Sequence, residues 1–581
     1  MNYPIWDLPA SGLLIAGVAI LHVFISHFAV GGGLFLVLTE AKARRNADAA
    51  LLGYVRAHSR FFILLTLVLG AVTGVGIWFT IGLVHPAATS SLIQTWVWAW
   101  AIEWTFFFTE IAAAMVYYYG WDRLPTRAHL AVGWIYAASA WLSLFVINGI
   151  LTFMLTPGAW VTTRGFLDGF FNPTFWPALA ARSFAAVGLA GIYALFTAAW
   201  VRDLDLRARV ARSAALGWVL PMAVALPGSL VWYLSAAAGA GVPVPAILGA
   251  ASGSVTDLFA ALAQAPASGQ PIVRAAAQTS VMASVLCLVV ALTVAALGHR
   301  VAPRLLAGAV MIAGLVALGG AEWVREGLRK PYVIGQFMFV TGVRLPPPPG
   351  VPGPGGEVPG PSDAFTVAAL DETGVLRASL WSRVDASGPP GDVDTTLAHG
   401  QEMYRLLCTS CHTVDGHLAV RPLVRGRSVE TIENVLGRLA TPIGASGAPT
   451  TWDDPELRLA TWRGRRMPPL VGTAREKHAL AVYLAHVGGA SREALSAPAP
   501  AGDPGQTFFE ANCAMCHGPA GAWPLSRKAP RTAGAYYELL GRLPEVNEMM
   551  PPFTGSDVDR RAVAAHLAAL AGGGRVREVP R

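Results

Sequence analysis

Long apolar runs dominate the first three hundred residues of the chain, and polar residues gather in short stretches between them. A helix needs about 20 consecutive apolar residues to cross the hydrocarbon core of a bilayer. Runs of that kind occur near residues 11–38, 61–84, 94–119, 130–154, 176–200, 214–236, 278–298 and 304–324. The pattern predicts an all-α fold that begins as a polytopic bundle of about eight transmembrane helices.

Basic residues alternate between the connections of these runs. Connections after the odd-numbered runs carry Lys42, Arg44, Arg45, Arg56, Arg60, Arg123, Arg127, Arg202, Arg207, Arg209, Arg212, Arg300 and Arg304, and the even-numbered connections hold only Arg164 and Arg274. Cytoplasmic loops are the ones enriched in Lys and Arg. The segment before the first run lacks the basic region of a signal peptide, so that run is expected to stay in the protein. We therefore predict a multi-pass protein of the bacterial cytoplasmic (inner) membrane with both termini on the periplasmic side.

A proline- and glycine-rich stretch follows the last run, from Leu345 to Pro361. Such a composition is typical of a semi-rigid spacer and not of a packed element. Residues 365–393 fit either a few strands or an extended tether. The spacer is expected to lead the chain out of the membrane.

Two short motifs in the last third of the chain carry the clearest chemistry. Cys408-Thr-Ser-Cys411-His412 and Cys513-Ala-Met-Cys516-His517 both have the spacing of a c-type haem attachment site. Two cysteines one helical turn apart form thioethers to the haem vinyl groups, and the adjacent histidine then faces the iron. A zinc or redox motif is the alternative for a bare pattern of this kind.

A methionine follows each motif at a proline-rich turn and is the expected second iron ligand. The first is Met467, in Arg466-Met467-Pro468-Pro469, and the second is Met550, which fits the same Met-Pro-Pro spacing better than Met549. A thioether ligand raises the haem potential. An amphipathic helix is expected after each methionine, over 476–486 and 558–570. Both stretches resemble small class I cytochromes c, which implies two covalent haem c groups.

Composition agrees with a membrane protein of redox function. Hydrophobic residues make up 54% and charged residues 14% of the chain, more apolar than a typical soluble domain. Four of the five cysteines belong to the haem motifs and Cys287 lies in an apolar run, so no disulfide framework is implied. The net charge of +7 is small for 581 residues and gives no reason to expect a nucleic-acid partner. We predict a membrane domain at 1–343, a linker at 344–393 and cytochrome c domains at 394–490 and 491–581.

Ionisable residues inside a membrane are costly and usually functional. His22, Glu103 and Glu110 fall within the predicted spans, and Glu326 lies just past the end of the eighth. At 1.5 Å per residue they belong to the outer half of the bilayer. Glu103 and Glu110 are seven residues apart and share one helical face. Such a set suits a haem site near the periplasmic surface, although a buried structural pair of acids and a core histidine are the plainer interpretations.

Several motifs, in sequence order, resemble subunit I of the cytochrome bd quinol oxidases. They are His22 with Leu38-Thr39-Glu40, Ala101-Ile102-Glu103, Phe-Thr-Glu110, Gly120-Trp-Asp-Arg-Leu124, Asn148-Gly149, Asn172-Pro173, Val281-Met282 and the run from Val324 to Gly335. The similarity covers roughly residues 10–340. It implies one or more non-covalent haems, b or d, in the membrane domain.

The resemblance also implies roles for single residues. His22 and Glu326 would be axial haem ligands, Glu103 and Glu110 would line that site and carry protons as its catalytic residues, and Met282 would bind a low-spin haem b. The family's histidine partner of that methionine would fall near Ala181 or Arg182, where this chain has none. The charged quinol-binding loop is also missing between residues 237 and 273, where the only acidic residue is Asp257.

The other histidines have ordinary explanations. His27 lies about 140° around the helix from His22, so one haem face cannot easily use both. His58 and His129 are expected at cytoplasmic helix ends, where an interfacial imidazole is common. His85 is expected to have a loop role, and the charges at 322–330 are spaced to pair with one another along a helix.

Three functional hypotheses remain. The favoured one is a membrane-bound electron-transfer subunit of a respiratory complex, which passes electrons between a bd-like haem or quinone site and periplasmic partners through two c haems. The second is a terminal oxidase that reduces dioxygen at the bd-like haems, fed by cytochrome c or quinol. The third is a cytochrome c anchor without membrane haem. The expected partners are a second membrane subunit similar to bd subunit II, periplasmic electron-transfer proteins and a quinone.

Overall fold

The computed structural model describes residues 8, 11–244, 271–297, 303–345, 365–386, 392–440, 467–496, 503–517, 532–546, 550, 552–553 and 555–572. The chain divides into two compact units. One, the membrane unit, comprises Leu13–Phe337, and the other, the extramembrane unit, comprises Met338–Arg581 with Met1–Gly12. Most of the predicted proline-rich spacer lies outside the described residues.

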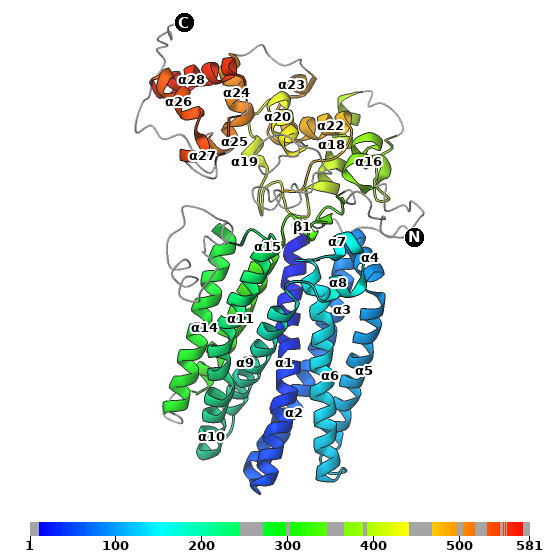
Figure 1. The fold of residues 1–581 in the computed structure, drawn as a ribbon, viewed down its shortest axis with the longest axis vertical. Coiled ribbons are helices and arrows are strands. Elements are labelled where there is room, and N and C mark those ends of the chain that lie inside the picture. The colour runs from blue at the N-terminus through cyan, green and yellow to red at the C-terminus, as the bar shows by residue number, and fades with distance from the viewer. Residues whose placement is uncertain are drawn as a thin grey trace. The chain divides into compact units, whose positions relative to one another are not determined.

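Among the described residues of the membrane unit, eight helical spans are long and apolar enough to cross a membrane, which confirms the predicted bundle (Figure 1). They are α1 (Ser11–Arg45), α2, η1 and α3 (Ala49–Ile63, Leu64–Gly70 and Ala71–Val84), α5 (Val97–Tyr119), α6 (Thr126–Phe153), α9 (Phe175–Ala198), α10, η2 and α11 (Leu204–Ala214, Ala215–Val219 and Leu220–Gly239), α14 (Pro271–Leu297) and α15 (Pro303–Arg329). The chain therefore contains an integral membrane domain.

Helix α1 lies inside the bundle and is closely approached from three sides. A Cβ added at Gly31 would lie 1.9 Å from the Ala186 carbonyl oxygen of α9, and one added at Gly33 would lie 2.2 Å from the ring of Tyr136 on α6. On a third side, a Cβ at Gly74 of α3 would lie 3.0 Å from the His22 ring. These glycines allow the helices to meet at backbone distance, so residues from α3, α6 and α9 reach α1.

Two of the spans contain a π-helical segment, η1 (Leu64–Gly70) and η2 (Ala215–Val219). Such segments widen the helix locally and are frequent at functional sites. Segment η1 ends three residues before Thr73, the residue that contacts His22.

Short elements close one end of the membrane unit. They are α4 (Pro86–Thr95), α7 (Trp160–Thr163), α8 (Phe166–Phe170) and β1 (Tyr332–Ile334). Trp96 is fully buried there and packs edge-on against Phe153 and Phe166, with ring centroids 4.9 and 5.1 Å apart. The buried Asn172 amide donates to Thr152 Oγ1 at 2.9 Å and fastens the α8 segment to α6. This end is therefore rigidly packed by aromatic rings and internal hydrogen bonds.

The extramembrane unit is also helical, apart from the short strand β2 (Met338–Phe339). Residues 365–393, for which strands and a tether were both considered, contain α16 (Val367–Thr373) and α17 (Val375–Ala378). A first CxxCH module follows with α18 (Val393–Leu407), α19 (Arg421–Val424), α20 (Val429–Ala440), α22 (Ala474–Val487) and α23 (Arg492–Ser496). A second CxxCH module has α24 (Pro504–Asn512), α25 (Ala514–His517), α26 (Ala533–Leu540), α27 (Leu543–Val546) and α28 (Asp557–Gly572).

Each CxxCH module contains a close crossing of its first and last helices, and the two crossings have the same geometry. Gly400 in α18 lies eight residues before Cys408, and a Cβ added to it would lie 2.0 Å from the Ala479 carbonyl oxygen of α22. Gly505 in α24 lies eight residues before Cys513, and its Cβ would lie 2.1 Å from the Ala562 carbonyl oxygen of α28. In each module the first and last helices therefore cross at a glycine, with the motif at the end of the first helix.

Candidate functional site

The first haem motif begins where α18 ends. Cys408 is the C-terminal cap of that helix, and the backbone N–H of His412 donates to the Cys408 carbonyl at 2.8 Å. The motif therefore forms one tight turn, which places both cysteines and the histidine on a short stretch of backbone.

The side chain of His412 is held in a defined tautomer. Its Nδ1 lies 2.9 Å from the Leu418 carbonyl oxygen, which can only accept a hydrogen bond. The proton must therefore sit on Nδ1, and Nε2 keeps its lone pair. A histidine that ligates a metal is usually oriented by such a second hydrogen bond, so His412 fits the role of an axial ligand.

The second motif has the same backbone arrangement. Cys513 caps α24 through a bond from its N–H to the Phe509 carbonyl at 2.8 Å, and the N–H of His517 donates to the Cys513 carbonyl at 2.9 Å. The side chain of Cys516 lies outside the described residues. Phe508 and Phe553 stack beside this turn with ring centroids 4.9 Å apart, which brings the segment after Met550 to the motif helix.

The two methionines occupy loops that lead into the last helix of each module. Met467 is 39% exposed, and Leu470 beyond it donates from its N–H to the Leu439 carbonyl of α20 at 3.2 Å. Met550 is half-buried. An imidazole and a soft thioether are donors that a c-type haem takes. The residue types in each module fit such a group, and the pairs His412 with Met467 and His517 with Met550 stay predictions.

In the membrane unit, His22 bonds to a residue of another span. Its Nδ1 lies 3.1 Å from Thr73 Oγ1, and that hydroxyl donates its only proton to the Leu69 carbonyl at 2.7 Å. The same hydroxyl also lies 3.1 Å from the Gly70 carbonyl oxygen. With its proton directed at either carbonyl, the threonine oxygen accepts from His22 Nδ1, and Nε2 is left with a lone pair. This is the neutral form that binds iron. Sequence reasoning expected no such partner, because Thr73 lies 51 residues away on α3.

Glu103 and Glu110 both lie on the side of α5 that meets α6. Ser143 Oγ donates to Glu103 Oε1 at 2.8 Å, and the Tyr136 hydroxyl donates to Glu110 Oε1 at 2.9 Å. Both carboxyl groups are partly buried and each is bonded to one neutral hydroxyl. Without a cationic partner in these contacts, they are suited to take up and release protons.

Glu326 is paired with its own helix. Its carboxylate lies 2.6 Å from Arg329 Nη2 and 3.1 Å from Lys330 Nζ, as the charge spacing predicted. A ligand role for Glu326 would have to compete with these two cations. Glu326 therefore stays a prediction as a haem ligand.

Met282 and the region of the missing histidine do not converge on a shared site. The Met282 side chain is 72% exposed on α14. Arg182 on α9 lies 3.6 Å from Glu322 on α15, which also accepts from Arg325 at 2.7 Å. Where the resemblance would put a histidine, this chain has an ion pair between two helices. The structure gives no support for Met282 as a ligand.

His85 joins α3 to α4 at the closed end of the membrane unit. Burial, together with the positive charges of Lys330 and Arg329, lowers the pKa of His85 to about 4. The imidazole is therefore neutral at physiological pH, close to the cations that pair with Glu326. No sequence pattern indicates this proximity, because the residues lie more than two hundred positions apart.

Comparisons with known proteins match two parts of the chain to family models. Residues 11–240 match the family model of cytochrome bd terminal oxidase subunit I, and residues 500–567 match that of the cbb3-type cytochrome c oxidase subunit III. Among solved structures, the bd oxidase from Geobacillus thermodenitrificans is similar at 18% identity and a TM-score of 0.45, over 56% of this chain and 87% of that one. The comparison with curated proteins gave no match.

Proposed function

Because residues 11–240 form a domain like subunit I of the cytochrome bd oxidases and the C-terminal region carries a cytochrome c domain, we propose a specific electron route. The protein is a membrane-bound multihaem subunit of a respiratory complex. It passes electrons between a bd-like haem or quinone site in the membrane and periplasmic partners, through two covalent c haems.

The hydrogen bond of His22, together with the family-like segment from His22 to Glu40, supports the proposal for the membrane site. His22 is bonded through Nδ1 to Thr73, which leaves Nε2 available for iron. His58 makes the same type of bond to Thr197, so the bond permits the ligand role and the resemblance to the family is what distinguishes His22. The same arrangement at His412 supports a c haem there. A haem bound at His22 would supply one-electron redox chemistry, and the c haems would link it to soluble carriers.

The chain's own residues have distinct tasks in this route. His22 fixes the membrane haem, and Thr73 holds the imidazole in its basic form. Glu103 and Glu110 exchange protons with the quinone or dioxygen that reacts beside that haem. In each module the cysteines attach the porphyrin, and Met467 and Met550 raise the potential of the c haems by soft ligation.

A terminal oxidase is the second candidate, and the pair of acids on α5 favours it. Reduction of dioxygen to water consumes protons, and Glu103 and Glu110 provide two protonatable groups with neutral hydroxyl partners. Quinone chemistry would use the same acids. The two candidates therefore differ in the final acceptor and share the His22 site.

One experiment separates these candidates. In the purified complex, His22→Ala should remove the acid–acetone-extractable haem while both covalent haems stay on the protein. Electron exchange between quinone analogues and the c haems should then collapse. A matched control is His58→Gln, which changes a buried histidine of α2 that bonds Thr197.

The outcomes are distinct. Unchanged extractable haem in His22→Ala would favour the anchor hypothesis. Oxygen consumption by the wild-type complex on the order of 10 per second or more, abolished in His22→Ala, would replace the electron-conduit proposal by the oxidase. Glu326→Ala should reduce haem content less than His22→Ala, because a carboxylate already paired with Arg329 is the weaker ligand.

A further inference from the structure

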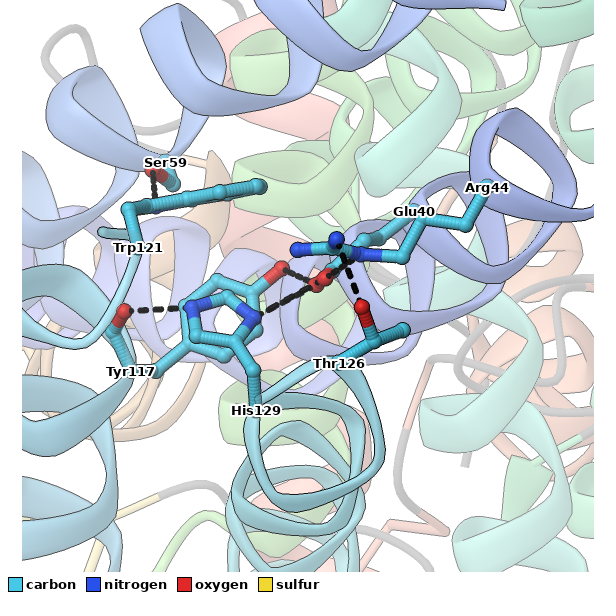
Figure 2. Close-up of polar contacts among 7 residues, drawn as sticks. All are labelled: Glu40, Arg44, Ser59, Tyr117, Trp121, Thr126 and His129. Carbon is cyan, nitrogen blue, oxygen red and sulfur yellow. Dashed lines mark hydrogen bonds and ion pairs between the residues drawn. The ribbon is translucent and has the colours of Figure 1, made fainter. Parts of the chain in front are cut away.

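A buried charged cluster joins α1, α5 and α6 at the end of the membrane unit that carries Arg44 and Arg45 (Figure 2). The Glu40 side chain is fully buried there. Its carboxyl group accepts from Arg44 Nε at 2.6 Å and from the Tyr117 hydroxyl at 2.6 Å, and it lies 2.9 Å from His129 Nδ1. Sequence reasoning treated His129 as an ordinary interfacial histidine and gave Glu40 no role.

His129 faces two acceptors. Its Nδ1 lies beside the Glu40 carboxylate, and its Nε2 lies 2.9 Å from the Tyr117 backbone carbonyl oxygen. A carbonyl oxygen cannot donate, so Nε2 must carry a proton. On the other side, either Nδ1 also carries a proton and meets an ionised Glu40, or Glu40 is protonated and donates to Nδ1.

Both arrangements contain one proton shared by Glu40 and His129. If that proton leaves, a lone pair of Nδ1 faces a buried carboxylate with no hydrogen between them. The site is therefore built to hold one exchangeable proton. The pair can pass that proton only to a group whose protonation is more favourable than protonation of the pair itself.

Three pairs of side chains form evenly spaced rungs between α5 and α6. They are Glu103 with Ser143, Glu110 with Tyr136, and Tyr117 with His129. Each rung is seven residues from the next on both helices, which is about 10 Å along the axis. The Glu40–His129 pair thus lies one rung beyond Glu110, on the side away from Glu103.

We propose that the Glu40–His129 pair is a proton-loading site that supplies Glu110. The inference rests on the proposed function, in which Glu110 and Glu103 exchange protons at the membrane haem. The pair gives its proton to the Glu110 carboxylate through the Tyr117 and Tyr136 hydroxyls and intervening water. Water at the end of the membrane unit that carries Arg44 and Arg45 then reprotonates the Glu40–His129 pair. One proton therefore enters for each proton delivered to Glu110.

Access from solvent is through the edge of the cluster. Arg44 is 22% exposed, and its Nη1 donates to the exposed Thr126 hydroxyl at 3.0 Å. Trp121 covers the remainder of the cluster. Its ring centroid lies 4.5 Å from that of His129, and its Nε1 donates to Ser59 of α2. Among the described residues, Arg44 contacts Glu40, and the exposed Arg56–Asp122 pair joins α2 to the turn after α5. The same elements also carry Lys42, Arg45, Arg60, Arg123 and Arg127.

A purely structural clamp is the competing explanation. The cluster does fasten three helices, but burial of an ionised carboxylate is costly and apolar contacts often stabilise as well. The two-acceptor environment of His129 is not needed for a clamp. It is needed if the site must keep a proton while water is excluded.

The protonation claim can be tested without any haem. In the complex labelled with ¹⁵N-histidine, we expect His129 either to show two N–H signals at neutral pH or to show one together with a protonated-carboxyl infrared band that disappears in Glu40→Gln. A single N–H signal with Glu40 ionised would overturn the proton-loading site. A failure of the membrane-haem proposal would leave this result unchanged, so the two claims fail separately.

The delivery claim needs a kinetic measurement. Arg44 Nε bonds Glu40 Oε1 and the Tyr117 hydroxyl bonds Oε2. In Glu40→Gln the amide oxygen can accept from Arg44, and the amide nitrogen can donate to His129 Nδ1 and to the Tyr117 oxygen, so the cluster stays bonded while the stored proton is lost. Proton uptake that follows reduction of the complex, measured with a pH dye, should slow at least about tenfold in this variant. Electron transfer to the c haems should keep its rate.

Two further variants decide the interpretation. Tyr117→Phe removes one hydroxyl of the route and should slow uptake while His129 stays protonated. His58→Gln, a buried histidine outside the α5–α6 interface, should leave uptake unchanged. Normal uptake in folded Glu40→Gln would show that the cluster is only a clamp.

Discussion

The first CxxCH module and the His22 site present a histidine in the same chemical form but obtain it in different ways. His412 is fixed by the Leu418 carbonyl, six residues further along the chain. His22 is fixed by Thr73, 51 residues away and on another span. The first arrangement depends only on a short stretch of sequence, so a copy of that stretch would carry the arrangement with it. The second arrangement exists only after α1 and α3 have packed.

The largest effect is expected where the chemistry is local and covalent. Cys408→Ser combined with Cys411→Ser should leave one covalent haem per chain, because thioether formation at the second module depends only on its own motif. Mass spectrometry after acid–acetone extraction counts the remaining haem. Loss of both covalent haems would show that haem attachment in one module depends on the other, and would contradict the view that each c-haem site is local.

The non-local site should respond to its distant partner. Thr73→Val removes the hydroxyl that orients His22, and loss of such a supporting bond typically lowers metal affinity about 10–100-fold. We expect the extractable haem to be bound more weakly in titrations, with both c haems unaffected. Thr73→Ser keeps the hydroxyl and is the control; an equal loss in the serine variant would point to packing and not to the hydrogen bond.

The modules themselves are not wholly local, because their first and last helices must cross. Gly400→Ala would place a methyl group 2.0 Å from the Ala479 carbonyl oxygen. Overpacking of this kind costs about 1–3 kcal/mol. The denaturant concentration at the midpoint of unfolding of the first CxxCH module, followed by the absorbance of its c haem, should therefore fall. Gly437→Ala, on an open face of α20, should not lower it; similar midpoints for the two variants would contradict the close crossing.

The smallest effect concerns pH. His85 has a pKa of about 4 in the folded protein, below its ordinary value of 6.5. Between these values the unfolded chain binds more protons, so stability is lost as pH falls from 6.5 towards 4. Thermal unfolding of the purified complex should show a shallower loss over this window in His85→Asn, and an unchanged pH profile would indicate that His85 is not buried in the assembled protein.

Much of the fold follows from pattern, and most of the missing detail is non-local. Apolar runs were sufficient for the eight spans, and helical spacing predicted that Arg325 would pair with Glu322. The α16 and α17 helices were not foreseen, because short helices that are fixed by tertiary contacts give little periodicity. Glu476, for example, accepts hydrogen bonds from the backbone of Val375 and Leu376 across a hundred residues.

The same limit explains what was missed at the membrane site. No periodicity reveals that Thr73 meets His22 or that Tyr117 and His129 enclose Glu40, since each contact joins different spans. Ionisable residues within the predicted spans indicated His22, Glu103 and Glu110, and the likeness to a family supplied their roles. It supplied a ligand role for Met282 as well, which the structure leaves on the surface of α14.

The π-helical segment η1 has a consequence for how this protein tolerates insertions and deletions. A wider turn acts as a phase shift: residues after Gly70 point in directions different from those they would have in an unbroken α-helix. Removal of one residue from Leu64–Gly70 would restore the regular winding, because six residues of α-helix turn through about the same angle as seven residues of π-helix. Thr73 would then keep its direction towards His22, so this apolar stretch can lose one residue without disconnecting the pair, whereas the histidine itself has no such substitute.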